Sequence, residues 1–378
     1  MSPAHAQPAF TAANAIVADV DDPAAAATNP AAAAFHDGVR GRIDVMVSAP
    51  RLEYRSPTGE RSRGEGVGTA GGPFAGLAVP LRQGFTATLD VGTSFALDLR
   101  WPDDAFPVFA QTGVPFLAPT RTRLGVVAAS PGLAWRPTPD FALALALNHY
   151  RSRRVAYDSV GIAIGGRGQG NGFTLAAIGR HGDFGFGAVY RSGPDIRMHG
   201  EVEGLPGPAR ADLRLPWAAQ AGVSWQLRRD VTVEFDFERV GWGRFDEVAI
   251  YSTELDRMVT RNAIAAHDAD AWRLSLKWKL DEATRLRAGI AWLDNPQRME
   301  GFSARTPGLV GRVAGFGLSR DFGDWTLDLA YQYRHMRRVR FDSELPYVPG
   351  GDPNGTQAFA GDYSGSNHLL GLGVQHRF

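Results

Sequence analysis

The sequence contains no cysteine and no long apolar run, and both absences narrow what the protein can be. Without cysteine, none of its 378 residues can form a disulfide, a thiolate metal site or a thiol nucleophile. No segment approaches the roughly 18 to 20 consecutive apolar residues of a membrane-spanning helix. The 40 basic and 40 acidic residues cancel, so the net charge gives no support for nucleic-acid binding. If the chain lies in a membrane, it does so as a β-barrel.

From about residue 40 onward, polar and apolar residues alternate with a period of two, which sends neighbouring side chains to opposite faces of a strand. In Ala271–Leu280 ("AWRLSLKWKL"), tryptophan and leucine alternate with arginine, serine and lysine. The segments Val231–Glu238 ("VTVEFDFE") and Thr284–Asp294 ("TRLRAGIAWLD") repeat the arrangement. A soluble sandwich would bury the apolar face, whereas a membrane barrel would turn it to lipid and the charged face to its lumen.

The end of the chain favours the barrel, because Phe378 is in phase with Leu372 and Val374 of an apolar closing strand. We therefore predict an all-β fold, a transmembrane antiparallel β-barrel of about fourteen strands. Residues 1–40 are expected to form a partly helical hatch inside the lumen, and residues 41–378 the wall. Phe378 is the expected C-terminal signal for the barrel-assembly machinery. The expected strands lie near 41–55, 73–82, 85–101, 121–137, 141–159, 172–183, 184–204, 211–229, 231–253, 268–282, 284–298, 310–323, 325–342 and 364–378.

An alanine-rich segment, Ala27–Gly38 ("ATNPAAAAFHDG"), precedes these strands. It predicts a short helix capped by Thr28 or Asn29, with Pro30 in its first turn. Alanines pack closely and leave no polar atom to satisfy, so they suit a plug inside a barrel. Further upstream, Ala4-His5-Ala6 fits the small-x-small pattern of a signal-peptide cleavage site. Two interpretations of that end stay open: the remnant of a trimmed export signal, or an ordinary N-terminus.

Charged residues are expected on the lumen side of three consecutive strands. The cations there can bind a ligand carboxylate, or they can pair with the acids of the preceding strand and hold a hydrated wall, which is the favoured interpretation. The expected lumen-lining residues are Arg273, Lys277, Arg285, Arg287, Glu234, Asp236 and Glu238.

Arginines are frequent in the later halves of the strands that should end at the cell surface. They predict a basic collar that contacts phosphate groups of lipopolysaccharide and outer-membrane lipid. The alternative is that strand ends beside loops are polar in any barrel. The run Arg334–Arg340 divides its charges between two strand faces, which argues against nucleic acid. The expected collar comprises Arg51, Arg55, Arg100, Arg151, Arg153, Arg154, Arg191, Arg197, Arg239, Arg244, Arg298, Arg337, Arg338 and Arg340.

No motif indicates catalysis, a cofactor or a metal site. The glycine-rich Gly165–Gly172 ("GGRGQGNG") lacks the lysine, serine and helix of a phosphate loop, so we expect a flexible hairpin loop. His149 and Ser152 would point to opposite faces of a strand, which is incompatible with a hydrolytic pair. Gly350–Thr356 lacks the acidic spacing of a calcium loop.

Several segments, spread along most of the chain, match one known family in order and spacing. They are residues 18–35 with Asn29-Pro30-Ala31, 213–225, 231–248, 270–292, 325–335 and 368–378. Together they resemble the FadL family of outer-membrane transporters, which carry long-chain fatty acids and other hydrophobic compounds such as aromatic hydrocarbons.

The resemblance implies a monomeric fourteen-stranded barrel whose hatch plugs the lumen, with Asn29, Pro30, Ala31 and Phe35 as hatch residues. It also implies lateral release of the ligand into the outer membrane through a gap at a kink in the third strand. The matching residues here are Gly92, Thr93, Ser94 and Phe95. Lateral exit keeps an apolar ligand out of water, and each CH₂ group gains about 0.8 kcal/mol by that. Phe10 is the candidate for the family's N-terminal phenylalanine at the ligand.

The chain departs from the fatty-acid transporters of this family at two positions. Where they hold the carboxylate with inward cations, this chain has Asp158 and Ala269. We therefore expect passive uptake of a compact or neutral apolar molecule, such as a monoaromatic hydrocarbon, without a cofactor. The alternatives are a general hydrophilic diffusion porin, which leaves the hatch unexplained, and a structural or adhesin barrel that transports nothing.

Overall fold

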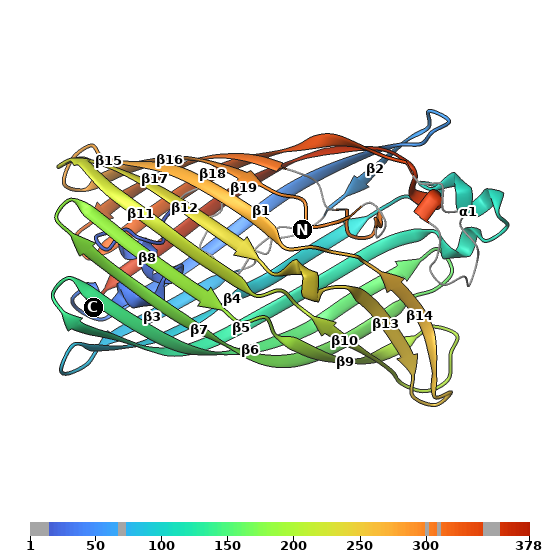
Figure 1. The fold of residues 1–378 in the computed structure, drawn as a ribbon, viewed down its shortest axis with the longest axis horizontal. Coiled ribbons are helices and arrows are strands. Elements are labelled where there is room, and N and C mark those ends of the chain that lie inside the picture. The colour runs from blue at the N-terminus through green and yellow to red at the C-terminus, as the bar shows by residue number, and fades with distance from the viewer. Residues whose placement is uncertain (1–14, 67–72, 299–301, 308–310, 343–355) are drawn as a thin grey trace.

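The computed structural model describes residues 15–66, 73–298, 302–307, 311–342 and 356–378. Antiparallel strands close into one barrel around the N-terminal segment (Figure 1). Nineteen strand segments build the fourteen strands of the wall, because five wall strands consist of two consecutive segments each. The predicted antiparallel barrel with a hatch in its lumen is confirmed.

Within the described residues, the wall contains nine unbroken strands and five that consist of two segments. The unbroken strands are β1 (Arg40–Arg55), β4 (Phe85–Arg100), β5 (Pro119–Thr138), β6 (Phe141–Ser159), β7 (Ile164–His181), β16 (Thr284–Leu293), β17 (Gly311–Phe322), β18 (Trp325–Phe341) and β19 (Gly361–Arg377). The interrupted strands are β2 (Arg61–Glu65) with β3 (Phe74–Pro80), β8 (Phe184–Arg191) with β9 (Asp195–Val202), β10 (Ala209–Arg214) with β11 (Ala218–Arg228), β12 (Val231–Val240) with β13 (Glu247–Ser252), and β14 (Arg257–Ala263) with β15 (Ala269–Lys279).

Helices are few and short. The described ones are η1 (Pro23–Ala27), η2 (Pro30–Phe35), α1 (Pro107–Gln111), η3 (Pro115–Leu117), η4 (Trp242–Arg244) and η6 (Thr356–Phe359). None of the helices in the described ranges is long and apolar enough to span a membrane. The barrel closes where β1 pairs with β19, from Arg40 opposite Arg377 to Arg55 opposite Asp362.

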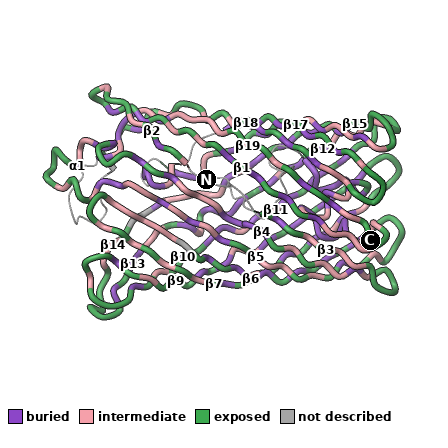
Figure 2. The backbone as a smooth tube through the Cα atoms, turned by 180° about the vertical axis from the view of Figure 1, so that it is seen from behind, coloured by how far each residue is buried: buried purple, intermediate pink, exposed green. Residues whose placement is uncertain are grey.

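The wall is apolar outside and polar inside, as the alternation predicts. On β15, Trp272 and Leu276 are 43% and 41% exposed, whereas Arg273 and Lys277 are 5% and 7% exposed. Buried and exposed positions alternate along the strands in Figure 2. This pattern is the reverse of a soluble protein and is typical of a wall that faces lipid.

Exposed aromatic side chains mark the two edges of the apolar belt. Such girdles are usual at the membrane interfaces of barrels. One edge carries Trp135, Trp225, Trp278 and Trp325, and the other carries Tyr190, Trp272, Trp292 and Tyr333.

The two ends of the barrel differ in their connections. At one end the turns are two to four residues long, for example 182–183 and 323–324, and the C-terminus lies there (Figure 1). Gly182 and Gly323 adopt positive φ angles of 58° and 63°, which suits such tight turns. The other end carries the longer connections, with α1 and η3. We call these the short-turn end and the long-loop end; in bacterial barrels the short turns are periplasmic.

The expectation of a hairpin loop at Gly165–Gly172 was wrong, because this segment lies within β7. Its alternate glycines present only hydrogen atoms to the lumen side. The neighbouring wall strand β9 comes close to them there. A Cβ at Gly168 would overlap Met198 and the carbonyl group of Arg197. Glycine is therefore required here by close packing, not by flexibility.

Candidate functional site

Asn29 holds the hatch together and fixes it to the wall. Its Oδ1 accepts a hydrogen bond from the N–H of Ala31 at 3.2 Å and so caps η2. Its Nδ2 donates to the carbonyl oxygens of Val17 and of Ala177 on β7, both at 2.9 Å. Of the two candidate caps, Asn29 begins η2, whereas Thr28 ends η1.

Small side chains allow the hatch to lie flat against β5–β8. Pro30 and Ala31 are buried, and Ala31 contributes to an apolar cluster that the hatch and the wall build together. Phe35 packs at the edge of this cluster, with the guanidinium of Arg136 5.5 Å from its ring centroid. The wall side of the cluster consists of Ala134, Ala142, Ala144, Ala176, Ile178 and Val189.

Two carboxylates of β12 bind the backbone of the hatch. Asp236 Oδ2 accepts hydrogen bonds from the N–H groups of Ile16 at 2.9 Å and Val17 at 3.3 Å. Glu234 Oε1 accepts one from the N–H of Ala18 at 2.7 Å. These acids therefore satisfy backbone donors that would otherwise be buried without a partner.

Two ion pairs join the hatch to β15 and β16. Lys277 pairs with Asp19, and Arg287 pairs with Asp22, with all four side chains at most 10% exposed. Arg287 Nη1 also donates to Ser319 Oγ at 2.5 Å. Burial alone would raise the pKa of Asp22, but Arg287 and Lys277 outweigh it and hold that pKa well below its usual value. The carboxylate of Asp22 is thus firmly ionised in the docked hatch.

The remaining expected lumen-lining residues pair within the wall. Arg273 lies 2.5 Å from Glu238 on the neighbouring β12. Arg285 makes a two-point contact with Asp321, at 2.6 and 2.8 Å. The sequence analysis missed Asp19 as a partner; the available signal was the acidic run "DVDD" ahead of a strongly basic wall.

Gly187 on β8 lets the hatch approach the wall. A Cβ there would overlap the carbonyl oxygen of Val17, a backbone atom that cannot move alone. We predict that Gly187→Ala displaces the hatch, because overpacking of this kind costs about 1–3 kcal/mol, or roughly 5- to 150-fold in the docking equilibrium. The readout is channel opening in planar bilayers. Ala188→Val, on the exposed face of the same strand, should leave the closed state unchanged, and equal behaviour of both variants would contradict the prediction.

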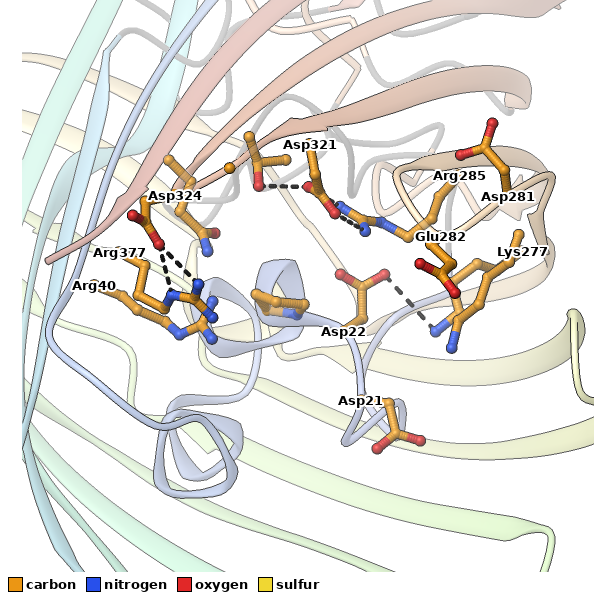
Figure 3. A pocket seen from close by; sticks show the side chains of 15 residues that line it. Asp21, Asp22, Arg40, Lys277, Asp281, Glu282, Arg285, Asp321, Asp324 and Arg377 are labelled. Atoms are coloured by element: carbon orange, nitrogen blue, oxygen red, sulfur yellow. Dashed lines mark hydrogen bonds and ion pairs between the residues drawn. The ribbon is translucent and has the colours of Figure 1, made fainter.

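A vestibule lined by charged residues lies beside the hatch at the short-turn end. Its volume is about 450 Å³, and five basic and six acidic residues line it. Figure 3 shows Asp22 and Lys277 on one side of this space, and the pair Arg377–Asp324 on the other. Arg377 Nη2 lies 2.7 Å from Asp324 Oδ1. Such a balanced lining suits water and exposes the ionic side of the hatch to it.

The expected gate residues lie where β4 departs from regular pairing. Gly92 still pairs with Phe74 of β3 and with Ala128 of β5. The register with β5 then shifts between Thr93 and Phe95, so that Ser94 is the additional residue of a β-bulge.

The bulge has two consequences for β4. It reverses the phase of the strand: Leu89 and Val91 face outward, whereas Phe95 and Leu99 are 4% and 3% exposed and face the lumen. On the side of β4 away from β5, the described residues pair at two places. β2 pairs with β4 at Arg100, and β3 pairs with it from Thr86 to Gly92. The residues between, 93–99, pair with none of the described residues on that side.

An apolar pocket lies in the lumen on the long-loop side of the bulge. Its volume is about 80 Å³, and side chains of β4–β7, β9, β10 and β13 line it. A smaller cavity of about 10 Å³ shares Leu97, Leu124 and Phe245 with the pocket and reaches Phe95. The lining of the pocket includes Val155, Ile164, Met198, Leu213, Val248 and Ile250.

Residues 302–307 fold inward at the long-loop end and cover this region. Trp101 Nε1 donates to the carbonyl oxygen of Ala304 at 2.9 Å. Arg305 crosses to β6, where its guanidinium donates to the carbonyl oxygen of Asp158 at 2.5 Å and lies 4.1 Å from the ring centroid of Tyr157. Thr306 lines the pocket itself.

The two positions expected to have lost a carboxylate-binding cation have other environments. Asp158 Oδ1 accepts a hydrogen bond from the N–H of Ile164 at 3.1 Å. Ala269 is 7% exposed and belongs to the same apolar cluster as Phe95 and Trp242.

Phe378 and the arginine collar complete the expected sites. Phe378 is 74% exposed at the short-turn end, and its N–H donates to Val39 O at 2.9 Å. The prediction that Arg191 belongs to the arginine collar was wrong. Its side chain is buried in the lumen, where it donates to Gln220 and to the carbonyl oxygen of Thr28. Its position in β8 places it on the inward face. Phe10 and residues 1–14 lie outside the described residues.

Comparison with known proteins points to one family. A family model for outer membrane protein transport proteins (OMPP1/FadL/TodX) matches residues 180–378, more than half of the chain. No curated protein sequence matches.

Solved structures match over almost the whole length at low sequence identity. A FadL homologue from Pseudomonas aeruginosa is 15% identical, with a TM-score of 0.77 over 100% of this chain and 99% of that one. The toluene transporter TodX of P. putida is 16% identical, with a TM-score of 0.70 over 94% of both chains. The toluene transporter TbuX of Ralstonia pickettii is 14% identical, with a TM-score of 0.67 over 100% and 98%. At such identities the likeness concerns the fold.

Proposed function

Because the chain belongs to the family of outer membrane protein transport proteins (OMPP1/FadL/TodX), we propose that it takes up small hydrophobic compounds passively and releases them sideways at the β4 bulge. The observation that carries this proposal is the continuity between the apolar pocket and Phe95, through a cavity with shared lining residues. Apolar side chains line the way from the pocket to the one region of β4 that lacks described strand partners on one side.

The size and lining of the pocket favour a compact substrate. Its volume of about 80 Å³ is smaller than the roughly 150 Å³ of a protein cavity that holds benzene, so even one ring needs some adjustment. Met198 in the lining can provide it, since methionine changes shape easily. Two similar structures are of toluene transporters by name, which agrees with a monoaromatic hydrocarbon.

The hatch argues against a hydrophilic diffusion porin. It is held by buried ion pairs, by hydrogen bonds from its backbone to Glu234 and Asp236, and by an apolar contact with β5–β8. The charged vestibule lies on the short-turn side of the hatch. The hatch therefore blocks the direct path of a polar solute through the lumen, whereas an apolar compound can leave through the wall at the β4 bulge.

Transport assays in liposomes can decide between the two functions. The proposal expects uptake of radiolabelled toluene and no swelling in isosmotic sugar. Sugar permeation without toluene uptake would reject it in favour of a porin, and neither activity would favour a structural barrel.

Arg334 on β18 bears on whether the substrate has a polar end. It continues the inward phase of Ala330 and Gln332, and its Nε is buried without a partner among the described residues. Asn367, its register neighbour on β19, likewise has a buried Oδ1 without a partner in the described part of the chain. The expected ligand cations, such as Arg287, are already engaged by acids, so Arg334 is the better candidate for a ligand carboxylate.

We predict that Arg334→Gln weakens binding of benzoate about tenfold and leaves toluene uptake unchanged, because only the anion uses the guanidinium. Calorimetry on the purified barrel measures the first effect, and proteoliposome uptake the second. Arg312→Gln, on the exposed face of the adjacent β17, serves as the control. Equal benzoate affinity of Arg334→Gln and wild-type protein, or no benzoate binding by wild-type protein, would contradict the prediction.

Three further expectations belong to the same proposal. The exposed arginines of the expected collar are suited to contact lipopolysaccharide and lipid phosphates near the long-loop end. Phe378 would act as the signal for the barrel-assembly machinery. The chain would work as a monomer with no cofactor, since one barrel contains the whole path from pocket to bulge.

A further inference from the structure

Four neighbouring wall strands are interrupted at one level of the barrel, and the interruptions are joined to each other. They lie at residues 192–194, 215–217, 241–246 and 264–268. Backbone hydrogen bonds connect each interruption to the next: Leu215 N–H to Pro194 O at 3.0 Å, Gly241 N–H to Trp217 O at 2.8 Å, and Ile264 N–H to Asp246 O at 2.7 Å. We call this band the seam.

The local sequence explains why the ladder breaks here. Pro194 and Pro216 have no N–H and cannot continue the hydrogen-bonding pattern of a central strand. Gly241 permits a close approach, since a Cβ there would overlap the indole ring of Trp217. Arg244 then ties the seam to β9, with its guanidinium donating to Gly193 O at 2.8 Å and to Asp195 Oδ1 at 2.7 Å.

The seam turns large apolar side chains into the lumen. Leu215, Trp242 and Phe245 are 1%, 4% and 5% exposed, although they belong to a wall whose large apolar residues mostly face lipid. Trp242 and Phe245 pack edge to face, with ring centroids 6.0 Å apart. They belong to one apolar cluster with Phe95, which comes from the bulge of β4 on another side of the barrel.

The seam and the bulge therefore meet across the lumen. Leu215, Trp242 and Phe245 line the cavity of about 10 Å³ together with Phe95, Leu97 and Leu124. That volume holds about one water molecule, so the contact is closed at rest. Because the cavity shares Phe245 with the apolar pocket, a compound moving from the pocket to the bulge must part these side chains.

We infer that Trp242 and Phe245 form, with Phe95, a size filter between the pocket and the lateral exit. This inference rests on the proposed function and adds which residues set the upper size of the substrate. Aromatic side chains can rotate aside for a flat single ring. The backbone behind Trp242 and Phe245 cannot recede, because the seam is fixed by its hydrogen bonds and by Arg244. Single-ring hydrocarbons should pass readily, and fused-ring hydrocarbons slowly.

Uptake of toluene and naphthalene into proteoliposomes, measured side by side, tests the filter. Phe245→Ala should raise the ratio of naphthalene to toluene uptake about tenfold, because truncation removes the bulk that faces Phe95. Phe245→Leu, a smaller truncation that keeps the site apolar, should raise it less but in the same direction. Phe235→Ala is the matched control, since this phenylalanine of β12 is 45% exposed on the lipid-facing side.

The outcomes separate the filter from the proposed function. If wild-type protein takes up no toluene, the transport proposal itself fails. If wild-type protein takes up toluene and the ratio stays the same in both Phe245 variants, the filter is refuted and the transport proposal stands. A smaller truncation is included so that a folding defect of Phe245→Ala leaves the test decisive.

Discussion

Deletion of residues 7–35 is expected to turn a closed barrel into a persistently open pore. A barrel of about fourteen strands is too wide to be filled by its own side chains, since about eight already fill theirs and 16 to 18 leave a water channel. The hatch supplies the missing filling between the wall and the vestibule. We expect sugar-driven liposome swelling to rise at least tenfold, and conductance in planar bilayers to become stable and large.

We expect the barrel wall to fold without residues 7–35. β1 pairs with β19 along its length, so the closure of the barrel does not need the hatch. The deletion does leave Lys277 and Arg287 without their acids, but the emptied lumen gives them water. Heat-modifiable migration on a gel reports whether the barrel is still folded. An intact barrel that remains impermeable without residues 7–35 would show that the hatch is not the plug.

A double substitution tests whether the two buried ion pairs hold the hatch in the closed position. Asp19→Asn with Asp22→Asn keeps the chain length but removes both acids from a buried site. Removing one partner of a buried pair typically costs about 3–5 kcal/mol. We expect intermittent openings, more frequent than in wild-type protein and less persistent than in the deletion, because the alanine contact with β5–β8 remains.

The faces of the strands could be read from the sequence because the alternation is a local property. Trp272 and Arg273 had to face opposite ways, and the closed sheet put the tryptophan outside. The pairing of Lys277 with Asp19 could not be read, because 258 positions separate the two residues and only the closed barrel brings them together. Sequence reasoning could therefore place a cation in the lumen but could not name its partner.

The seam shows a different limit. The alternation predicts continuous strands over 184–204, 211–229 and 231–253, although Pro194 and Pro216 lie within the first two. Proline inside a central strand was a usable signal for an interruption. What the sequence could not indicate is that neighbouring interruptions align, because their relative height depends on the register of the closed barrel. The aromatic contact with Phe95 follows from that alignment.

Removal of the β4 bulge is expected to reduce transport strongly. Deleting Ser94 would remove the additional residue between Thr93 and Phe95, so that β4 can pair with β5 without a register shift. Phe95 would keep Val126 as its partner and would stay on the lumen side, because β5 alternates without a break through this region. The bend that the bulge gives to β4 would be lost. A straight β4 would no longer diverge from β2 and β3 over residues 93–99, so the lateral exit beside Phe95 would close.

We expect this deletion to lower toluene uptake at least tenfold, through loss of the lateral exit, while the barrel folds and stays closed to sugar. Ser94→Ala is the matched control: it keeps the length of β4, and hence the bulge, and should transport like wild-type protein. If the Ser94 deletion folds and still delivers toluene at the wild-type rate, the substrate leaves by another route, and the hatch and its vestibule become the path to examine.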